Sequence, residues 1–143
     1  KSRNLAFCKY RYQICSFTAQ SECLRQAMHG NDIYCQAHDG AGKTALLVIA
    51  TLQQLEFING EFSTLVLCFS RENAHKIKEE YEKLSKYMSI KTALSLGGVS
   101  ADKDKVVFEK ERPHIFIGTS LRIRNLIQTG ALRMGKIKYA EFY

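Results

Sequence analysis

The sequence predicts an α/β fold, a mostly parallel sheet with helices on both faces, and three observations support this. The first is that strand-like and helix-like runs alternate after residue 30, as they do in repeated βαβ units. The second is a glycine-rich loop at residues 37–44, which separates a β-branched run from an apolar helical run. The third is the length of 143 residues, which suits one domain with its own core.

The expected elements follow in chain order from their side-chain patterns. We expect helices at 20–29, 44–56, 71–88, 102–111 and 120–128, and strands at 33–37, 64–69, 92–96, 114–118 and 138–143. The strand at 33–37 is β-branched and aromatic, and the helix at 44–56 starts with residues that are apolar nearly all round. Asn59-Gly60 marks a turn before the second strand, and Gly97-Gly98 marks the break after the third.

The helix expected at 71–88 has the clearest pattern. Apolar residues recur there at steps of three and four, while lysines and glutamates fill the opposite face. A coiled-coil seam would look the same over so short a stretch. We favour a helix that covers the sheet, because the flanking runs are strand-like.

The loop at residues 37–44 has the composition of a phosphate-binding loop. Gly40 and Gly42 allow a tight turn that aims backbone N–H groups at an anion, and the following helix adds the positive end of its dipole. Lys43 would place its ammonium on the outer phosphates, and Thr44 would offer its hydroxyl to Mg²⁺. The candidate nucleotide-binding residues here are Ala37, His38, Asp39, Gly40, Ala41, Gly42, Lys43 and Thr44. The alternative is a glycine turn that a lysine happens to follow.

Charge and composition narrow the partner class. The net charge is +7, and residues 105–143 carry eight basic and three acidic side chains. This excess favours a polyanionic partner, with nucleic acid ahead of a membrane, although a solvated basic face would give the same composition.

The longest apolar run, Ala45–Ala50, is too short to span a bilayer. The five cysteines lack Cys-x-x-Cys spacing, so we expect reduced thiols in an intracellular protein.

The chemically unusual segments fall where the predicted strands end. They are the phosphate loop, Ser70–Glu72, Gly97-Gly98 and Gly118-Thr119, each of which follows a different strand. Ligands of parallel sheets bind outside the carboxyl ends of the strands. The sequence therefore predicts one continuous binding edge.

Taken in order, these residues resemble the first RecA-like domain of a DEAD-box RNA helicase. Ala37–Thr44 matches its phosphate-binding motif, Phe69–Ala74 resembles Pro-Thr-Arg-Glu-Leu-Ala, and Thr119–Arg122 stands where the family has Thr-Pro-Gly-Arg. Gly97-Gly98 matches the family's glycine doublet, and Gln20 stands at its adenine-reading glutamine. The strings most similar to the DECD subclass, the ATPase of pre-mRNA splicing and mRNA export, are Leu52–Glu56, Glu80–Met88 and Arg112–Thr119.

The resemblance implies a three-layer RecA-like P-loop domain that binds ATP and Mg²⁺ through Gln20 and Ala37–Thr44. Lys43 and Thr44 are the catalytic candidates that the chain contains, and Thr44 would hold Mg²⁺ through ATP. The resemblance places single-stranded RNA on Arg71, Gly97, Gly98, Thr119 and Arg122. The alternative for the two arginines is a solvent-facing position at a helix start. The resemblance also implies mRNA-processing or export proteins as partners, a nuclear location and a monomer.

Three departures from the family pattern change what we expect of the activity. Asp39 replaces a threonine or serine, and its carboxylate would repel a triphosphate unless Mg²⁺ or a salt bridge compensates. Ser120-Leu121 replaces Pro-Gly, which removes the glycine's close backbone approach to RNA. Lys138–Tyr143 resembles the strand that carries the Asp-Glu-x-Asp motif, and the sequence stops there, before the acidic pair that would hold Mg²⁺ and orient the attacking water.

We therefore expect residues 1–143 to be a partial ATP-binding domain 1, without the second helicase domain, from a longer chain that starts before Lys1. We expect it to bind ATP but not to hydrolyse it efficiently by itself. A diverged, non-catalytic module that binds RNA or protein is the first alternative. A small P-loop kinase is the second, and the lack of an arginine-rich, lid-like insertion disfavours it.

Overall fold

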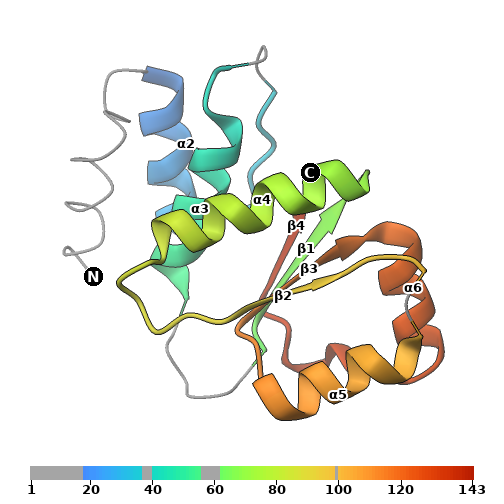
Figure 1. Ribbon diagram of the computed structural model, residues 1–143. Helices are drawn as coiled ribbons and strands as arrows, with labels where there is room; N and C mark the ends of the chain where they lie inside the picture. Colours follow the sequence, from blue (N-terminus) through green and yellow to red (C-terminus); the bar gives the residue numbers. More distant parts are fainter. Residues whose placement is uncertain (1–17, 37–39, 56–61, 99) are drawn as a thin grey trace. The chain divides into compact units, whose positions relative to one another are not determined.

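A computed structural model of the chain describes residues 18–36, 40–55, 62–98 and 100–143 (Figure 1). The chain divides into two compact units, residues 1–55 and residues 56–143, which are described in turn. In the first unit, helix α2 (Thr18–Met28) packs against helix α3 (Lys43–Gln54). The side-chain amide of Gln54 donates a hydrogen bond to the Ala27 carbonyl and so links the end of one helix to the end of the other. Both helices lie close to their expected positions.

The strand expected at 33–37 does not form over residues 33–36, and Ala37 lies outside the described residues. Residues 31–36 are all exposed, and the Tyr34 side chain is 88% exposed. A β-branched and aromatic composition reports how well side chains suit a sheet surface, whereas a strand also needs a hydrogen-bonded neighbour. The prediction from composition was therefore wrong for this segment.

The second unit contains a four-stranded sheet in the order β2-β3-β1-β4, and all three neighbouring pairs are parallel. The strands are β1 (Thr64–Cys68), β2 (Thr92–Ser95), β3 (Ile115–Thr119) and β4 (Tyr139–Phe142). The helices are α4 (Arg71–Leu84), α5 (Ala101–Glu111) and α6 (Ser120–Gln128), and a 3-10 turn, η2 (Met134–Lys136), precedes β4. In Figure 1, α4 covers one face of the sheet, and α5 and α6 lie on the other. This arrangement confirms the predicted three-layer α/β fold.

Helix α4 begins at a serine cap and ends before its apolar pattern does. The Ser70 hydroxyl accepts a hydrogen bond from the Asn73 N–H at 3.1 Å, which satisfies one of the donors that a helix start leaves open. The expected helix runs to Met88, but residues 85–88 form a turn in which the Met88 N–H donates to the Ser85 carbonyl at 2.7 Å. Apolar spacing alone does not mark a helix end.

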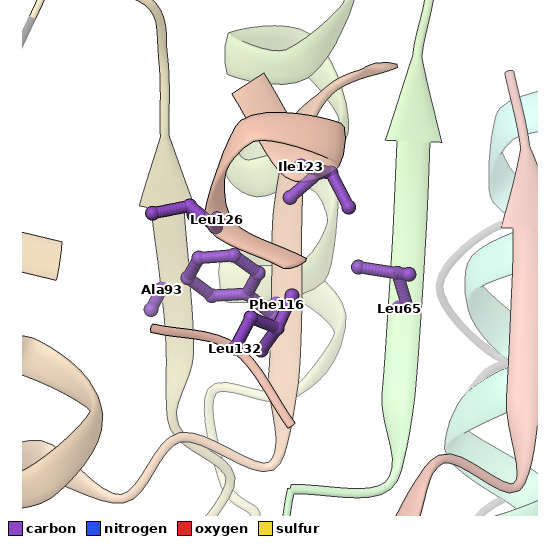
Figure 2. Close-up of a cluster of buried hydrophobic side chains, with 6 residues drawn as sticks. All are labelled: Leu65, Ala93, Phe116, Ile123, Leu126 and Leu132. Carbon is purple, nitrogen blue, oxygen red and sulfur yellow. The ribbon is translucent and has the colours of Figure 1, made fainter. Parts of the chain in front are cut away.

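The core of this unit lies on both faces of the sheet. On the face of α6, Phe116 is 1% exposed, and the strand register places it level with Leu65 and Ala93. Figure 2 shows its ring enclosed by the apolar side chains that complete this cluster, Ile123, Leu126 and Leu132. On the opposite face, α4 buries Ala74, Ile77, Tyr81 and Leu84. The burial of large apolar side chains on both faces is the main stabilising contribution to such a layered domain.

A carboxyl group lies within the edge strand β4. Glu141 pairs with Val66 of β1 and accepts a hydrogen bond from the Tyr81 hydroxyl at 2.9 Å. Burial raises the pKa of Glu141 to about 8, although the hydrogen bond from Tyr81 acts in the opposite direction. Burial, reinforced by the charge of Glu141, raises the pKa of the Cys68 thiol to about 11. In the folded chain the Glu141 carboxyl is therefore mostly protonated at neutral pH.

The raised pKa of Glu141 predicts a loss of stability with rising pH. The ordinary pKa of 4.5 applies to the unfolded chain, so between 4.5 and about 8 the folded state holds a proton that the unfolded state releases. Relative to Glu141→Gln, the native chain should lose at most about 1.4 kcal/mol of unfolding free energy per pH unit across this window. Urea unfolding of both proteins at about pH 5 and about pH 8 measures the difference.

A second variant tests the assignment to this carboxyl. Tyr81→Phe removes the hydrogen bond that lowers the pKa of Glu141, so the loss of stability should extend to higher pH. Equal pH dependence of the native chain and Glu141→Gln would contradict the assignment.

Candidate functional site

The phosphate loop lies in the first unit, where its glycines take the backbone conformation that the prediction required. Gly40 and Gly42 have φ angles of 82° and 77°, in the left-handed region that favours glycine. Gly42 is the N-cap of α3, and Lys43 and Thr44 are the first two residues of that helix. Ala37, His38 and Asp39 lie outside the described residues, and Gln20 lies in the first turn of α2.

The start of α3 has the properties of an anion site. The N-cap residue, Gly42, has no side chain that could occupy the helix start, and the first turn of α3 contains no acidic residue. Backbone N–H groups and the helix dipole at such a terminus favour a phosphate group. The residues from Gly40 to Thr44 therefore fit the triphosphate and the Mg²⁺ ion that the sequence predicts.

Three of the four segments of the predicted binding edge, Ser70–Glu72, Gly97-Gly98 and Gly118-Thr119, lie in the second unit. The fourth, the phosphate loop, lies in the first unit, and the strand expected before it does not form over residues 33–36. Cys68 at the end of β1 is level with Thr119 at the end of β3. Thr119 and Arg71, which lies three residues after Cys68, are therefore at the ends of neighbouring strands. The Arg71 guanidinium lies against the glycine doublet, because its Nη2 is 3.5 Å from the position that a Cβ would take at Gly97. The corresponding distance at Gly98 is 3.8 Å, and Gly98 has a φ of 103°. Three segments far apart in sequence thus form one exposed edge with an arginine across it.

Arg122 lies elsewhere than expected, because its side chain is 8% exposed and held by an ion pair. Its Nη2 and Nε lie 2.8 and 3.0 Å from a single carboxylate oxygen of Asp104. Nη2 also donates to the Ser100 carbonyl at 3.0 Å, and the Ser95 hydroxyl donates to the same carboxylate. The side chain therefore ties α6 to α5 and β2, and it does not lie in solvent at the helix start.

Asp104 is the residue that sequence reasoning missed at this edge. It lies in the first turn of α5 among other charged residues, and nothing in that local pattern distinguishes it from a solvated side chain. Gly118 is also needed for packing, since a Cβ there would lie 2.7 Å from the Ile123 Cδ1 and 2.8 Å from the Ser95 carbonyl oxygen. Glycine therefore lets α6 approach the sheet closely just before Thr119.

Removing the buried arginine should destabilise the second unit strongly. Arg122→Ala leaves the Asp104 carboxylate buried without its partner, which costs about 3–5 kcal/mol of unfolding free energy. The matched control is Arg124→Ala, an exposed arginine on the same helix, for which we expect a change within about 0.5 kcal/mol. Urea unfolding followed by circular dichroism measures both. Similar small losses in the two variants would contradict a structural role for the ion pair.

Comparison with known proteins gives a family and two curated relatives. Residues 17–140 match the family model described as DEAD/DEAH box helicase. The chain is 46% identical over 121 residues to human ATP-dependent RNA helicase DDX39A, covering 84% of the chain and 28% of that protein. It is 45% identical over 131 residues to ATP-dependent RNA helicase SUB2 of Chaetomium globosum, covering 87% and 30%. The chain thus spans less than a third of the length of these relatives.

Solved structures share the fold. A DEAD box protein from Methanococcus jannaschii is 26% identical with a TM-score of 0.79, over 87% of this chain and 34% of that one. A variant of Saccharomyces cerevisiae Dbp5, bound to Nup159, a Gle1 variant, IP6 and ADP, is 20% identical with a TM-score of 0.78, over 98% and 37%. In the described part of the chain, no helix is long and apolar enough to cross a membrane.

Proposed function

Because the chain belongs to the DEAD/DEAH box helicase family, we propose that it binds ATP and single-stranded RNA as the first domain of an RNA helicase of the mRNA splicing and export type. Family membership confirms the resemblance stated from the sequence, including its DECD-type character. The observation that carries the proposal is the junction at Gly40–Thr44, where two left-handed glycines lead into the N-terminus of α3. We also propose that the chain has mRNA-processing or export proteins as partners, a nuclear location and a monomeric state, as the resemblance implies.

The nucleotide role follows from the chemistry of the loop. Backbone N–H groups at the start of α3 would hold the phosphates, and Lys43 would neutralise part of their charge. Thr44 would hold Mg²⁺, which supplies charge neutralisation when it is bound with ATP. Gln20 would read the adenine, and Ala37, His38, Asp39 and Ala41 complete the proposed loop site. We propose that residues 1–143 bind ATP and that efficient hydrolysis needs, in addition, an acidic motif that holds Mg²⁺ and orients the attacking water.

The RNA role follows from the exposed edge of the second unit. Arg71 supplies a cation, and the glycine doublet and Thr119 supply backbone that RNA phosphates can approach closely. Such contacts do not depend on base identity. We propose that Arg122 supports this edge through its ion pair with Asp104 rather than by direct contact with RNA.

One observation favours the alternative of a non-catalytic binding module. Leu121 lies two residues after Thr119 and is 78% exposed, where the family pattern has glycine. A large apolar side chain at this point suits a binding surface that has lost close contact with an RNA backbone. The nucleotide experiment separates the two functions, because the alternative requires little or no ATP binding.

Isothermal titration of the chain with ATP and with ADP in the presence of Mg²⁺ tests the nucleotide role. We expect binding that Lys43→Ala weakens about 10- to 100-fold, because a charge-assisted contact to phosphate contributes about 1.5–3 kcal/mol. Lys103→Ala removes an exposed lysine from the second unit and should bind like the parent chain. No detectable heat of binding with the parent chain would exclude the ATP role.

The RNA role predicts weak binding that depends on salt. Fluorescence anisotropy with a labelled oligouridine should give an affinity that falls linearly on a log–log plot against salt concentration. Arg71→Ala should reduce that slope by about 0.7–1, the value for one phosphate contact, whereas Arg133→Ala at another exposed position should change it less. Binding that salt does not affect would count against phosphate contacts at this edge.

A further inference from the structure

The aromatic residue at the end of β1 is exposed beyond what packing explains. Phe69 is 93% exposed, more than any other large apolar side chain in the described part of the chain. Two further apolar side chains, Leu121 and Phe142, are each 78% exposed and follow or end the two strands beside β1. Exposed apolar groups that gather at one place mark binding surfaces more often than scattered ones do.

The backbone that carries Phe69 is fixed on both sides. The Phe69 N–H donates to the Tyr143 carbonyl at 2.9 Å, which continues the pairing of β1 with β4. The next residue, Ser70, caps α4 through its hydrogen bond from the Asn73 N–H. The ring is therefore presented by a strand end and a helix start, so little conformational entropy would be lost when it binds a ligand.

The neighbours of Phe69 point to the chemistry of that ligand. Arg71 follows two residues later, so its Cα lies at most about 7 Å from that of Phe69. The Arg71 guanidinium lies on the Gly97-Gly98 backbone. An exposed aromatic ring beside a cation and open backbone is the combination that single-stranded nucleic acid sites use. An apolar protein surface would complement the ring. It would leave the Arg71 guanidinium without an opposite charge and the glycine backbone without a hydrogen-bonding group.

We propose that Phe69 is a stacking platform for one base of the single-stranded RNA bound at this edge. The proposal rests on the RNA role of Arg71 and adds to it a contact with a base, where the arginine and the glycines contact phosphate. Every base has a π face, so the contact binds RNA without reading its sequence. The ring and the guanidinium then hold different parts of the same strand.

The test compares two oligonucleotides that differ only in their bases. One is an oligouridine, and the other is an abasic oligoribonucleotide with the same sugar-phosphate backbone. Phe69→Ala should weaken binding of the oligouridine about 5- to 100-fold, the effect of losing one stacked base, and leave binding of the abasic strand unchanged. Arg71→Ala should weaken both. The matched control is Tyr87→Ala, which removes an aromatic ring that is 72% exposed in the turn after α4 and should change neither.

A fluorescence measurement gives an independent readout that keeps the aromatic ring. The chain contains no tryptophan, so Phe69→Trp introduces a single tryptophan, whose emission can be excited apart from that of the tyrosines. Stacking on a base should quench its emission when oligouridine binds and not when the abasic strand binds. Because this variant retains a large ring, it also tests the proposal if Phe69→Ala fails to fold.

The outcomes separate the stacking proposal from the RNA role itself. Unchanged oligouridine affinity in Phe69→Ala, with Arg71→Ala weakened, overturns stacking, leaves the RNA role intact and points to a protein partner for the ring. Equal weakening toward both oligonucleotides also overturns it, because the ring would then act on the backbone contacts. No RNA binding by the parent chain at low salt removes the RNA role, and the stacking proposal with it.

Discussion

The functional edge of the second unit depends on the parallel hydrogen bonding of β1 to β3 on one side and β4 on the other. Parallel pairing gives every strand the same direction, so each carboxyl end, and the segment that follows it, emerges along one edge. The register then determines which residues of neighbouring strands lie side by side, so that Cys68 lies beside Thr119 and Ser95 lies beside Gly118. Cys68 and Thr119, 51 positions apart in the chain, become neighbours through backbone pairing.

The sequence predicted the layers well because their causes are local and periodic. Helix α6 begins and ends at the predicted residues, and each strand of the sheet lies within one or two residues of its expected limits. The errors arose in segments whose side chains suit a strand or helix that the backbone does not form there. Residues 33–36 have strand-forming side chains without a strand, and α4 stops at Leu84 although apolar spacing continues to Met88. A propensity describes a side chain's fit to an element, and the pairing or capping that forms the element lies elsewhere in the chain.

At the candidate site, the sequence indicates the backbone geometry better than it indicates which charges are buried. Gly40, Gly42 and Gly98 all have positive φ, a conformation that glycine adopts more readily than other residues. Arg122 reads in sequence like Arg71, an arginine near a helix start, yet one is buried in an ion pair and the other is exposed. Its partner, Asp104, is 18 residues away and unremarkable in sequence. The surroundings of Glu141 cannot be predicted from the sequence either, because it is the packing of α4 that brings the Tyr81 hydroxyl to its carboxyl group.

The packing of the Arg71 guanidinium on the glycine doublet links two motifs that lie on different strand ends. A methyl group at position 97 would just touch Nη2, and a longer side chain would displace the arginine from the edge. Position 98 adds a second restriction through its φ of 103°. Substitutions at 71 and at 97 should therefore be non-additive, since a side chain gained at 97 removes much of what the arginine could still contribute. Position 71 can therefore hold its arginine at the edge only while position 97 stays small, although 25 residues separate the two in the chain.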